Sequence, residues 1–73
     1  MAATRTFSGH KLRELRKRAG VTATDLAFTC GRSEQMVWAW EQGRHKPAPD
    51  LLPVIARRLG VDHAELFEDT SNA

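Results

Sequence analysis

The sequence predicts an all-α fold: one compact bundle of five short helices. Apolar residues recur at spacings of three and four, and Ser, Thr or Asp precedes each apolar run. Glycine follows most of these runs, and no stretch shows the sustained alternation of a half-buried strand. With 73 residues, the chain is expected to form a single domain with its core over about residues 9–67 and short flexible tails at both ends.

The first two helices have clear start and stop signals. Ser8 is the expected cap of a helix that runs through Arg18 and stops at Gly20. Thr22 is the expected cap of a second, short helix that ends near Gly31.

The third helix is expected between its cap Ser33 and a stop at Gly43. Its inward positions follow the i, i+3, i+4 pattern at Val37, Trp40 and Glu41. Met36 is expected to be partly inward, and the outward arcs carry Glu34, Gln35, Trp38, Ala39 and Gln42.

Two further helices complete the expected bundle. Asp50 is the expected cap of the fourth, because this start places Pro53 in the first turn, where its missing N–H costs no hydrogen bond. That helix stops at Gly60, and Asp62 and Glu65 form a D-x-x-E cap for a last short helix.

Charge is distributed unevenly along the chain. All eleven Lys and Arg lie within residues 1–58 with five acids, whereas residues 59–73 hold four acids and no base. The basic part suggests a polyanionic partner, although solvated helix faces would give the same count. The single cysteine cannot form an internal disulfide, and no apolar run could cross a bilayer, so we expect a cytoplasmic protein without membrane association.

The residues for catalysis are missing. His10, His45 and His63 lack the spacing of metal ligands, and no glycine-rich phosphate loop is present. Cys30 has no His or Asp arrangement nearby and is interpreted as a small buried hydrophobe. The sequence therefore predicts no enzyme, no metal site and no cofactor.

The second and third helices, joined by a short turn containing Gly31, form a helix-turn-helix arrangement. With its flanking segments, the chain resembles the Cro/lambda-repressor-like (xenobiotic-response-element type) family of helix-turn-helix DNA-binding regulators. The matching patterns are L-R-x-L-R-x-x-x-G at residues 12–20, V-x-x-W-E-x-G at 37–43 and L-x-x-x-A-x-x-L-G-V at 52–61. The resemblance covers Gly9 to about Phe67. It implies a lambda-repressor-like domain that regulates transcription, as a repressor, by placing its third helix (about 33–42) in the major groove of an operator.

The family pattern also implies a structural ion pair, here between Arg16 and Glu41. Two positions depart from the pattern. Many members begin the second helix with a glutamine that braces a base-reading side chain, and this chain has Ala23. A base-reading position one turn into the third helix is Ala39, so the recognised base sequence is left open.

Base contacts are expected from the outward face of the third helix. Gln35 can pair with adenine, Glu34 can accept from cytosine N4, and Ala39 can pack on a thymine methyl group. Trp38 shares the face of Glu34 and Gln35 and is expected to contact sugars or thymine methyls. The alternatives for Trp38 are packing flat on the helix surface and anchoring a partner protein.

Phosphate contacts are expected around the same helix. Positive side chains in the turn before it and the loop after it can neutralise phosphates, and hydroxyls at helix starts can donate to them. These candidates are Thr22, Arg32, Ser33, Arg44 and Lys46, with Lys11 and Arg13 as further cations. An ordinary basic loop and simple helix caps are the alternative interpretations.

A homodimer is expected, because one small domain reads few base pairs and paired half-sites multiply specificity. The last helix, with Leu66 and Phe67, is the expected dimer surface, and closure of the core is its alternative role. The competing function is a protein-interaction module on the same fold, in which exposed Trp38 and Phe28 bind a regulatory partner.

Overall fold

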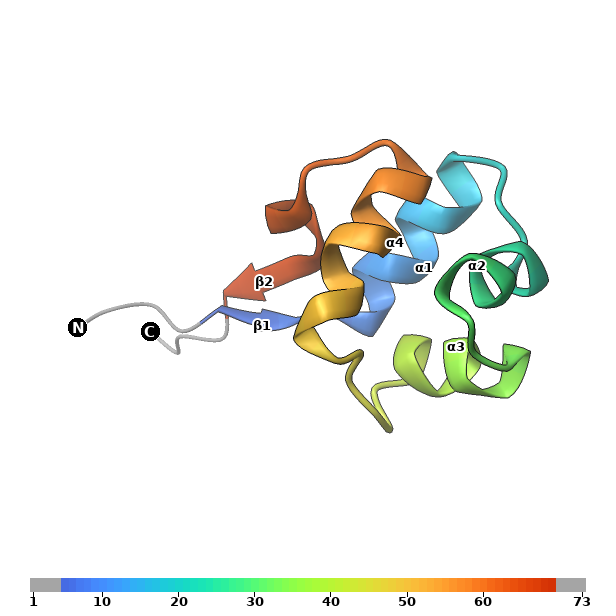
Figure 1. Ribbon diagram of the computed structural model, residues 1–73. Coiled ribbons are helices and arrows are strands. Elements are labelled where there is room, and N and C mark those ends of the chain that lie inside the picture. The colour runs from blue at the N-terminus through green and yellow to red at the C-terminus, as the bar shows by residue number, and fades with distance from the viewer. Residues whose placement is uncertain (1–4, 70–73) are drawn as a thin grey trace.

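The computed structural model describes residues 5–69. Four α-helices pack around one another, and two short strands extend to one side of them (Figure 1). The elements in chain order are β1 (Arg5–Phe7), α1 (Gly9–Arg18), α2 (Ala23–Cys30), α3 (Glu34–Glu41), the 3₁₀ helix η1 (Pro49–Leu51), α4 (Leu52–Leu59), the 3₁₀ helix η2 (His63–Leu66) and β2 (Phe67–Asp69).

The first three α-helices begin and end where local chemistry predicts. The side chains of Ser8, Thr22 and Ser33 each accept the backbone N–H three residues later, at 3.2, 3.0 and 3.2 Å. These three predicted caps are confirmed, and each satisfies a donor that the first helical turn leaves free. Gly31 ends α2 with φ +67°, a left-handed conformation that costs a residue with a Cβ more than it costs glycine.

The predicted start of the fourth helix is wrong. Asp50 lies inside η1, whose N-cap is Ala48, and neither η1 nor α4 has a side-chain cap. Pro49 explains the earlier start, because its fixed φ suits the first position of a helical turn and so the turn begins before Asp50. Pro53 does fall in the first turn of α4, where its missing N–H is harmless.

The predicted fifth α-helix is a single 3₁₀ turn, so the described chain has four α-helices rather than five. The predicted cap at its start is confirmed: Asp62 accepts the N–H of Ala64 at 3.0 Å, and Glu65 reaches back to the N–H of Asp62. The turn stops because Phe67 adopts extended backbone and enters a strand.

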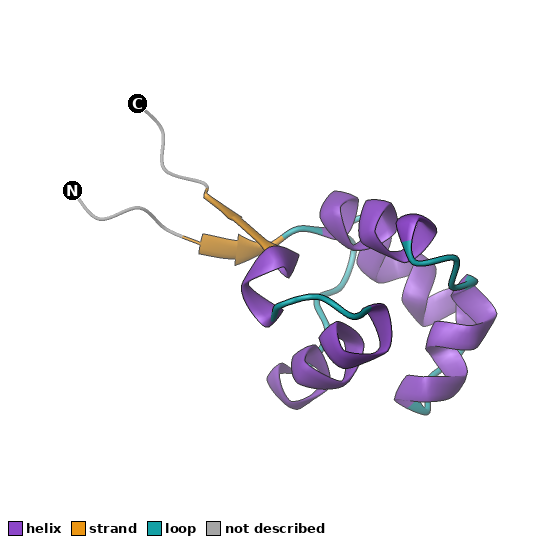
Figure 2. Cartoon of the chain, turned by 90° about the horizontal axis from the view of Figure 1, so that it is seen from above, coloured by secondary structure: helices purple, strands orange, loops and turns teal. Residues whose placement is uncertain are grey.

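The absence of strands was also a wrong prediction. β1 and β2 lie side by side (Figure 2) and pair antiparallel. In their register, Arg5 lies opposite Asp69 and Phe7 opposite Phe67. Each strand has three residues, too few to show an alternating pattern in the sequence. Parts of the expected flexible tails are therefore paired strands, and their outer parts, residues 1–4 and 70–73, lie outside the described residues.

The core lies between the four α-helices and η2. Its fully buried large side chains are Leu12, Leu26, Val37, Trp40, Ile55 and Leu66. Cys30 is buried, as predicted, and contributes as a small apolar side chain. Because Leu66 is 0% exposed within its own domain, it is not available for the expected dimer surface, while Phe67 is half-buried.

A close approach of backbone positions the end of α3. A Cβ built at Gly9, the first residue of α1, would collide with the backbone carbonyl oxygens of Trp40 and Glu41. Only glycine allows α1 to start this near to α3, so the residue fixes the distance between the two helices.

Candidate nucleic-acid interface

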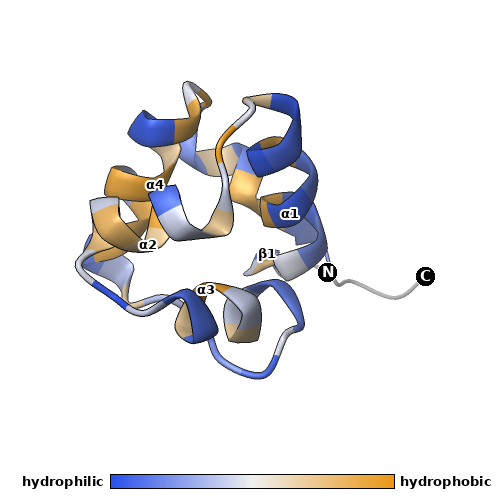
Figure 3. Cartoon of the chain, turned by 90° about the vertical axis from the view of Figure 1, so that its right-hand side faces the viewer, coloured by the Kyte–Doolittle hydropathy of each residue, from blue (hydrophilic) through white to orange (hydrophobic). Residues whose placement is uncertain are grey.

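The two tryptophans of α3 point in different directions, as the helical rotation of about 100° per residue requires. Trp40 is 2% exposed and lies in the core, whereas Trp38 is 44% exposed. Gln35 and Gln42 are also exposed, and Glu34 and Ala39 are half-buried. The helix and its following hydrophilic loop lie together at one side of the molecule (Figure 3).

One hollow gathers several of the predicted DNA-contacting side chains. It has a volume of about 300 Å³ and is lined by Gln35, Trp38, Ala39, Gln42 and Arg44. These residues supply two amides, an indole, a methyl group and a guanidinium on one surface. Amides and methyl groups recognise base edges, and a guanidinium binds phosphate, so the surface has the chemistry of a major-groove reader.

Trp38 also lines a second hollow, between α1 and α3. This hollow has a volume of about 400 Å³, and α1 contributes Arg13 and Arg16 to it. Trp38 therefore lines both hollows, and Arg13 lines the second one with it. Lys11 is less available, because its Nζ donates to the carbonyl of Phe67 at 3.0 Å.

Thr24 is a site residue that the sequence analysis missed. Its Oγ1 donates a hydrogen bond of 2.8 Å to Glu34 Oε2, so α2 holds the carboxylate at the start of α3. The only signal in the sequence for this role was a hydroxyl side chain in the first turn of α2. Glu34 is thereby oriented while its second oxygen can still accept a hydrogen bond.

Three of the polar candidates already make hydrogen bonds within the fold. The hydroxyl oxygens of Thr22 and Ser33 accept their cap hydrogen bonds, which leaves each hydroxyl proton free to be donated. Arg32 Nη1 donates to the carbonyls of Cys30 and Gly31 at 3.4 and 3.2 Å. The rest of this guanidinium retains donors for an anion.

Arg44 and Lys46 follow α3 and are both exposed. The backbone N–H of Arg44 donates to the carbonyl of Ala39 at 2.9 Å, which ties the start of the loop to the helix. Within residues 5–69, the charged groups of these two side chains have no hydrogen-bond or ion-pair partner. Both charges are therefore free to neutralise phosphate.

Arg16 on α1 and Glu41 on α3 form an ion pair between these two helices, and both line the second hollow. Arg16 Nε lies 2.5 Å from Glu41 Oε2, Nη2 lies 3.2 Å from Oε1, and Nη1 donates to the carbonyl of Val21 at 3.0 Å. The hydrogen bond to Glu41 raises the pKa of the Arg16 guanidinium, although burial acts in the opposite direction. The two side chains are only 11% and 6% exposed, so the structure places this pair in the packing between the helices.

Residues 5–69 contain no group of three His, Cys, Asp or Glu that could hold a metal ion. None of the helices in that range has the length and apolar character needed to cross a membrane.

A family model described as a helix-turn-helix domain matches residues 9–68. The chain belongs to the Cro/lambda-repressor-like helix-turn-helix family. An uncharacterized HTH-type transcriptional regulator of Methanothermobacter thermautotrophicus is 43% identical over 54 residues, covering 74% of this chain and 78% of that protein. The HTH-type regulator y4dJ of Sinorhizobium fredii is 33% identical over 66 residues, covering 90% and 86% of the two chains.

Solved structures show the same family. The restriction-modification controller protein C.AhdI from Aeromonas hydrophila has a TM-score of 0.73 and 32% identity, covering 81% of this chain and 89% of that one. The hydroxypropylphosphonic acid epoxidase from S. wedmorenis has a TM-score of 0.77 and 27% identity, but only 35% of its chain is covered. The likeness to an enzyme thus concerns about a third of that protein, and the family here is one of transcription regulators, not of enzymes.

Proposed function

We propose that this helix-turn-helix regulator represses transcription by binding a double-stranded operator with α3 in the major groove. The observation that carries the proposal is the hollow in which Gln35, Trp38 and Ala39 lie with Arg44. Base-reading groups of α3 and a phosphate-binding group of the loop that follows it thereby share one surface, as major-groove recognition requires.

The roles of the base-contacting residues follow from their chemistry. Gln35 presents a bidentate amide to adenine, and Glu34, oriented by Thr24, accepts from cytosine N4. Ala39 packs on a thymine methyl group, and Trp38 contacts sugars and methyl groups at the edge of the same hollow.

Phosphate contacts surround these residues. Arg44 and Lys46 neutralise phosphates on one side of α3, and Arg32, Ser33 and Thr22 contact them at its N-terminal side. The positive end of the α3 dipole adds to this attraction. Because these contacts carry no sequence information, they set the affinity and orientation rather than the base preference.

The protein acts as a homodimer in the cytoplasm, associated with the nucleoid through DNA. A dimer is supported by geometry, since a single α3 spans only one half-site. Similarity to a controller protein, C.AhdI, supports the regulatory role. A protein-interaction role for Trp38 is less well supported, because this side chain shares its hollow with Arg44 and Gln35.

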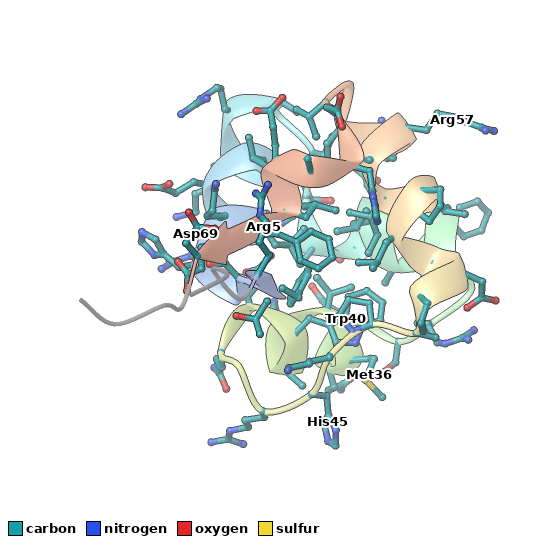
Figure 4. All side chains as sticks on the ribbon, turned by 90° about the vertical axis from the view of Figure 1, so that its left-hand side faces the viewer. Arg5, Met36, Trp40, His45, Arg57 and Asp69 are labelled. Atoms are coloured by element: carbon teal, nitrogen blue, oxygen red, sulfur yellow. The ribbon has the colours of Figure 1, made fainter. Side chains whose placement is uncertain are left out.

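Fluorescence anisotropy with a labelled duplex of mixed sequence tests the phosphate contacts. A dimer with two or more phosphate contacts per subunit gives a slope of log affinity against log salt of about −4 or steeper. The double variant Arg44→Gln/Lys46→Gln should bind more weakly at every duplex sequence and show a shallower slope. Arg57→Gln is the matched control, because Arg57 is exposed and lies away from α3 (Figure 4). A flat salt dependence of the parent would refute the proposal.

A further inference from the structure

A basic and apolar surface lies at the junction of α2 and α4. We call it the α2–α4 patch and define it by Phe28, Thr29, Val54, Arg57 and Arg58. Phe28 is 88% exposed, twice the exposed fraction of Trp38. Burying a phenyl ring in a complex is favourable, so an aromatic side chain this exposed marks a contact site when other binding features surround it.

Those features are present beside Phe28. Thr29, Val54, Arg57 and Arg58 line a hollow of about 410 Å³, and Thr29 directly follows Phe28 in α2. Half-buried Val54 provides an apolar wall. Arg58 Nε donates to Thr29 Oγ1 at 3.3 Å, which holds this guanidinium at the rim of the hollow.

The two arginines have no acidic partner within the chain. In the described range, neither Arg57 nor Arg58 forms an ion pair. The DNA-binding surface does not explain them either. Arg57 lies at the opposite end of the molecule from Met36 and His45, which belong to α3 and its following loop (Figure 4). Two cations beside an apolar hollow therefore remain without a ligand when DNA occupies the face of α3.

We propose that the α2–α4 patch binds an acidic amphipathic segment of another protein. An aromatic or aliphatic side chain of that segment packs against Phe28 and enters the hollow, while its carboxylates pair with Arg57 and Arg58. Charge complementarity identifies the partner chemistry, and a guanidinium fork suits a carboxylate.

A second copy of this chain fits less well. Within residues 59–69, the acids Asp62, Glu65, Glu68 and Asp69 lie on or next to η2 and β2. β2 extends from the side of the molecule opposite to α2 (Figure 1). Docking of these acids on the patch of a second copy would be head-to-tail, a contact that does not close into a symmetric dimer.

Selection from a phage-displayed library of random 12-residue peptides tests the proposal. The full 73-residue chain is the target, and the Phe28→Ser/Arg57→Gln variant serves for counter-selection. Enriched peptides should carry an aromatic or aliphatic residue flanked by Asp and Glu. A synthetic enriched peptide should bind Phe28→Ala about tenfold or more weakly, as expected of a central aromatic contact. Arg57→Gln/Arg58→Gln should bind it several-fold more weakly, and Arg18→Gln, an exposed arginine of α1, should bind it like the parent.

Four results would overturn the proposal. The first is the absence of any enrichment that depends on Phe28. The second is loss of peptide binding in Arg44→Gln but not in Phe28→Ala, which would locate the peptide on the face of α3. The third is a dimer of the parent that Phe28→Ala dissociates in sedimentation, since a second copy would then occupy the patch. The fourth is weaker duplex binding by Arg57→Gln/Arg58→Gln, which would make the patch a nucleic-acid surface. Peptide binding does not depend on operator binding, so failure of the proposed function would leave this test intact.

Discussion

Thr24 on α2 donates a hydrogen bond of 2.8 Å to Glu34, the first residue of α3. The carboxylate at the start of α3 is therefore oriented by the preceding helix, α2. In a position where the family places a glutamine brace, this chain has Ala23, whose side chain is apolar and buried.

Replacing Thr24 should change specificity more than affinity. Thr24→Ala frees the Glu34 carboxylate, so discrimination at the base pair that we propose Glu34 contacts should fall by about tenfold, within the range of one good base contact. Thr24→Ser keeps the hydroxyl and should retain the parental preference. Competition binding with duplexes that differ at single base pairs measures the change, and equal loss at every position would contradict it.

The Arg16–Glu41 pair should contribute strongly to stability when one partner is removed. Glu41→Ala leaves a nearly buried guanidinium without its carboxylate, which should cost about 3 kcal/mol of unfolding free energy. The double variant Arg16→Met/Glu41→Leu removes both charges and should recover most of the loss. Urea denaturation measures both values. If the double variant is as unstable as Glu41→Ala, the unpaired Arg16 charge is not the cause of the lost unfolding free energy.

Gly9 should not tolerate even a methyl group. The Cβ of Gly9→Ala would meet backbone carbonyls at the end of α3, so the two helices must separate, at a cost of about 1–3 kcal/mol. Alanine is otherwise the better helix former by up to about 1 kcal/mol, so loss of stability would come from packing alone. Thermal unfolding of Gly9→Ala and the parent tests this. A variant more stable than the parent would show that the contact between Gly9 and the end of α3 leaves room for a methyl group.

Cys30 should link stability to alkaline pH. Burial raises the pKa of its thiol above the ordinary value of 9.0, while the charge of Arg32 acts in the opposite direction. The unfolded chain then loses this proton at lower pH than the native chain. The stability that Cys30 contributes is complete below about pH 9 and falls as the pH rises beyond it.

Cys30→Ala provides the matched comparison for this titration. The parent should lose more unfolding free energy than Cys30→Ala between about pH 8 and pH 10.5, since only the parent carries the thiol. Parallel profiles in urea denaturation would contradict the prediction. A thiol reagent should likewise react slowly with the native chain and rapidly in urea, because the thiol is buried.

The elements that local chemistry determines could be predicted from the sequence. The caps at Ser8, Thr22 and Ser33 each depend on a neighbour three residues away, and the separation of Trp38 from Trp40 follows from helical rotation alone. The start at Asp50 was wrong because the prediction considered only Pro53, which must lie in a first helical turn. Pro49 also favours the first position of a helical turn, and the chain begins its turn there.

Features that depend on distant segments could not be predicted. The strands pair residues at opposite ends of the chain, such as Arg5 and Asp69, and three residues carry no visible period. The contact between Thr24 and Glu34 depends on how α2 crosses α3. Leu66 was expected at a dimer surface, with the core as its alternative, and the packing of η2 places it in the core.

Selection of bound sequences from a pool of random duplexes tests the central claim most directly. The parent should enrich one motif, and Gln35→Ala and Trp38→Ala should each relax or change specific positions within it, because both side chains lie on the outward face of α3. Arg57→Gln should enrich the parental motif. Absence of an enriched motif, or motifs unchanged in both α3 variants, would contradict the assignment of α3 as the reading helix.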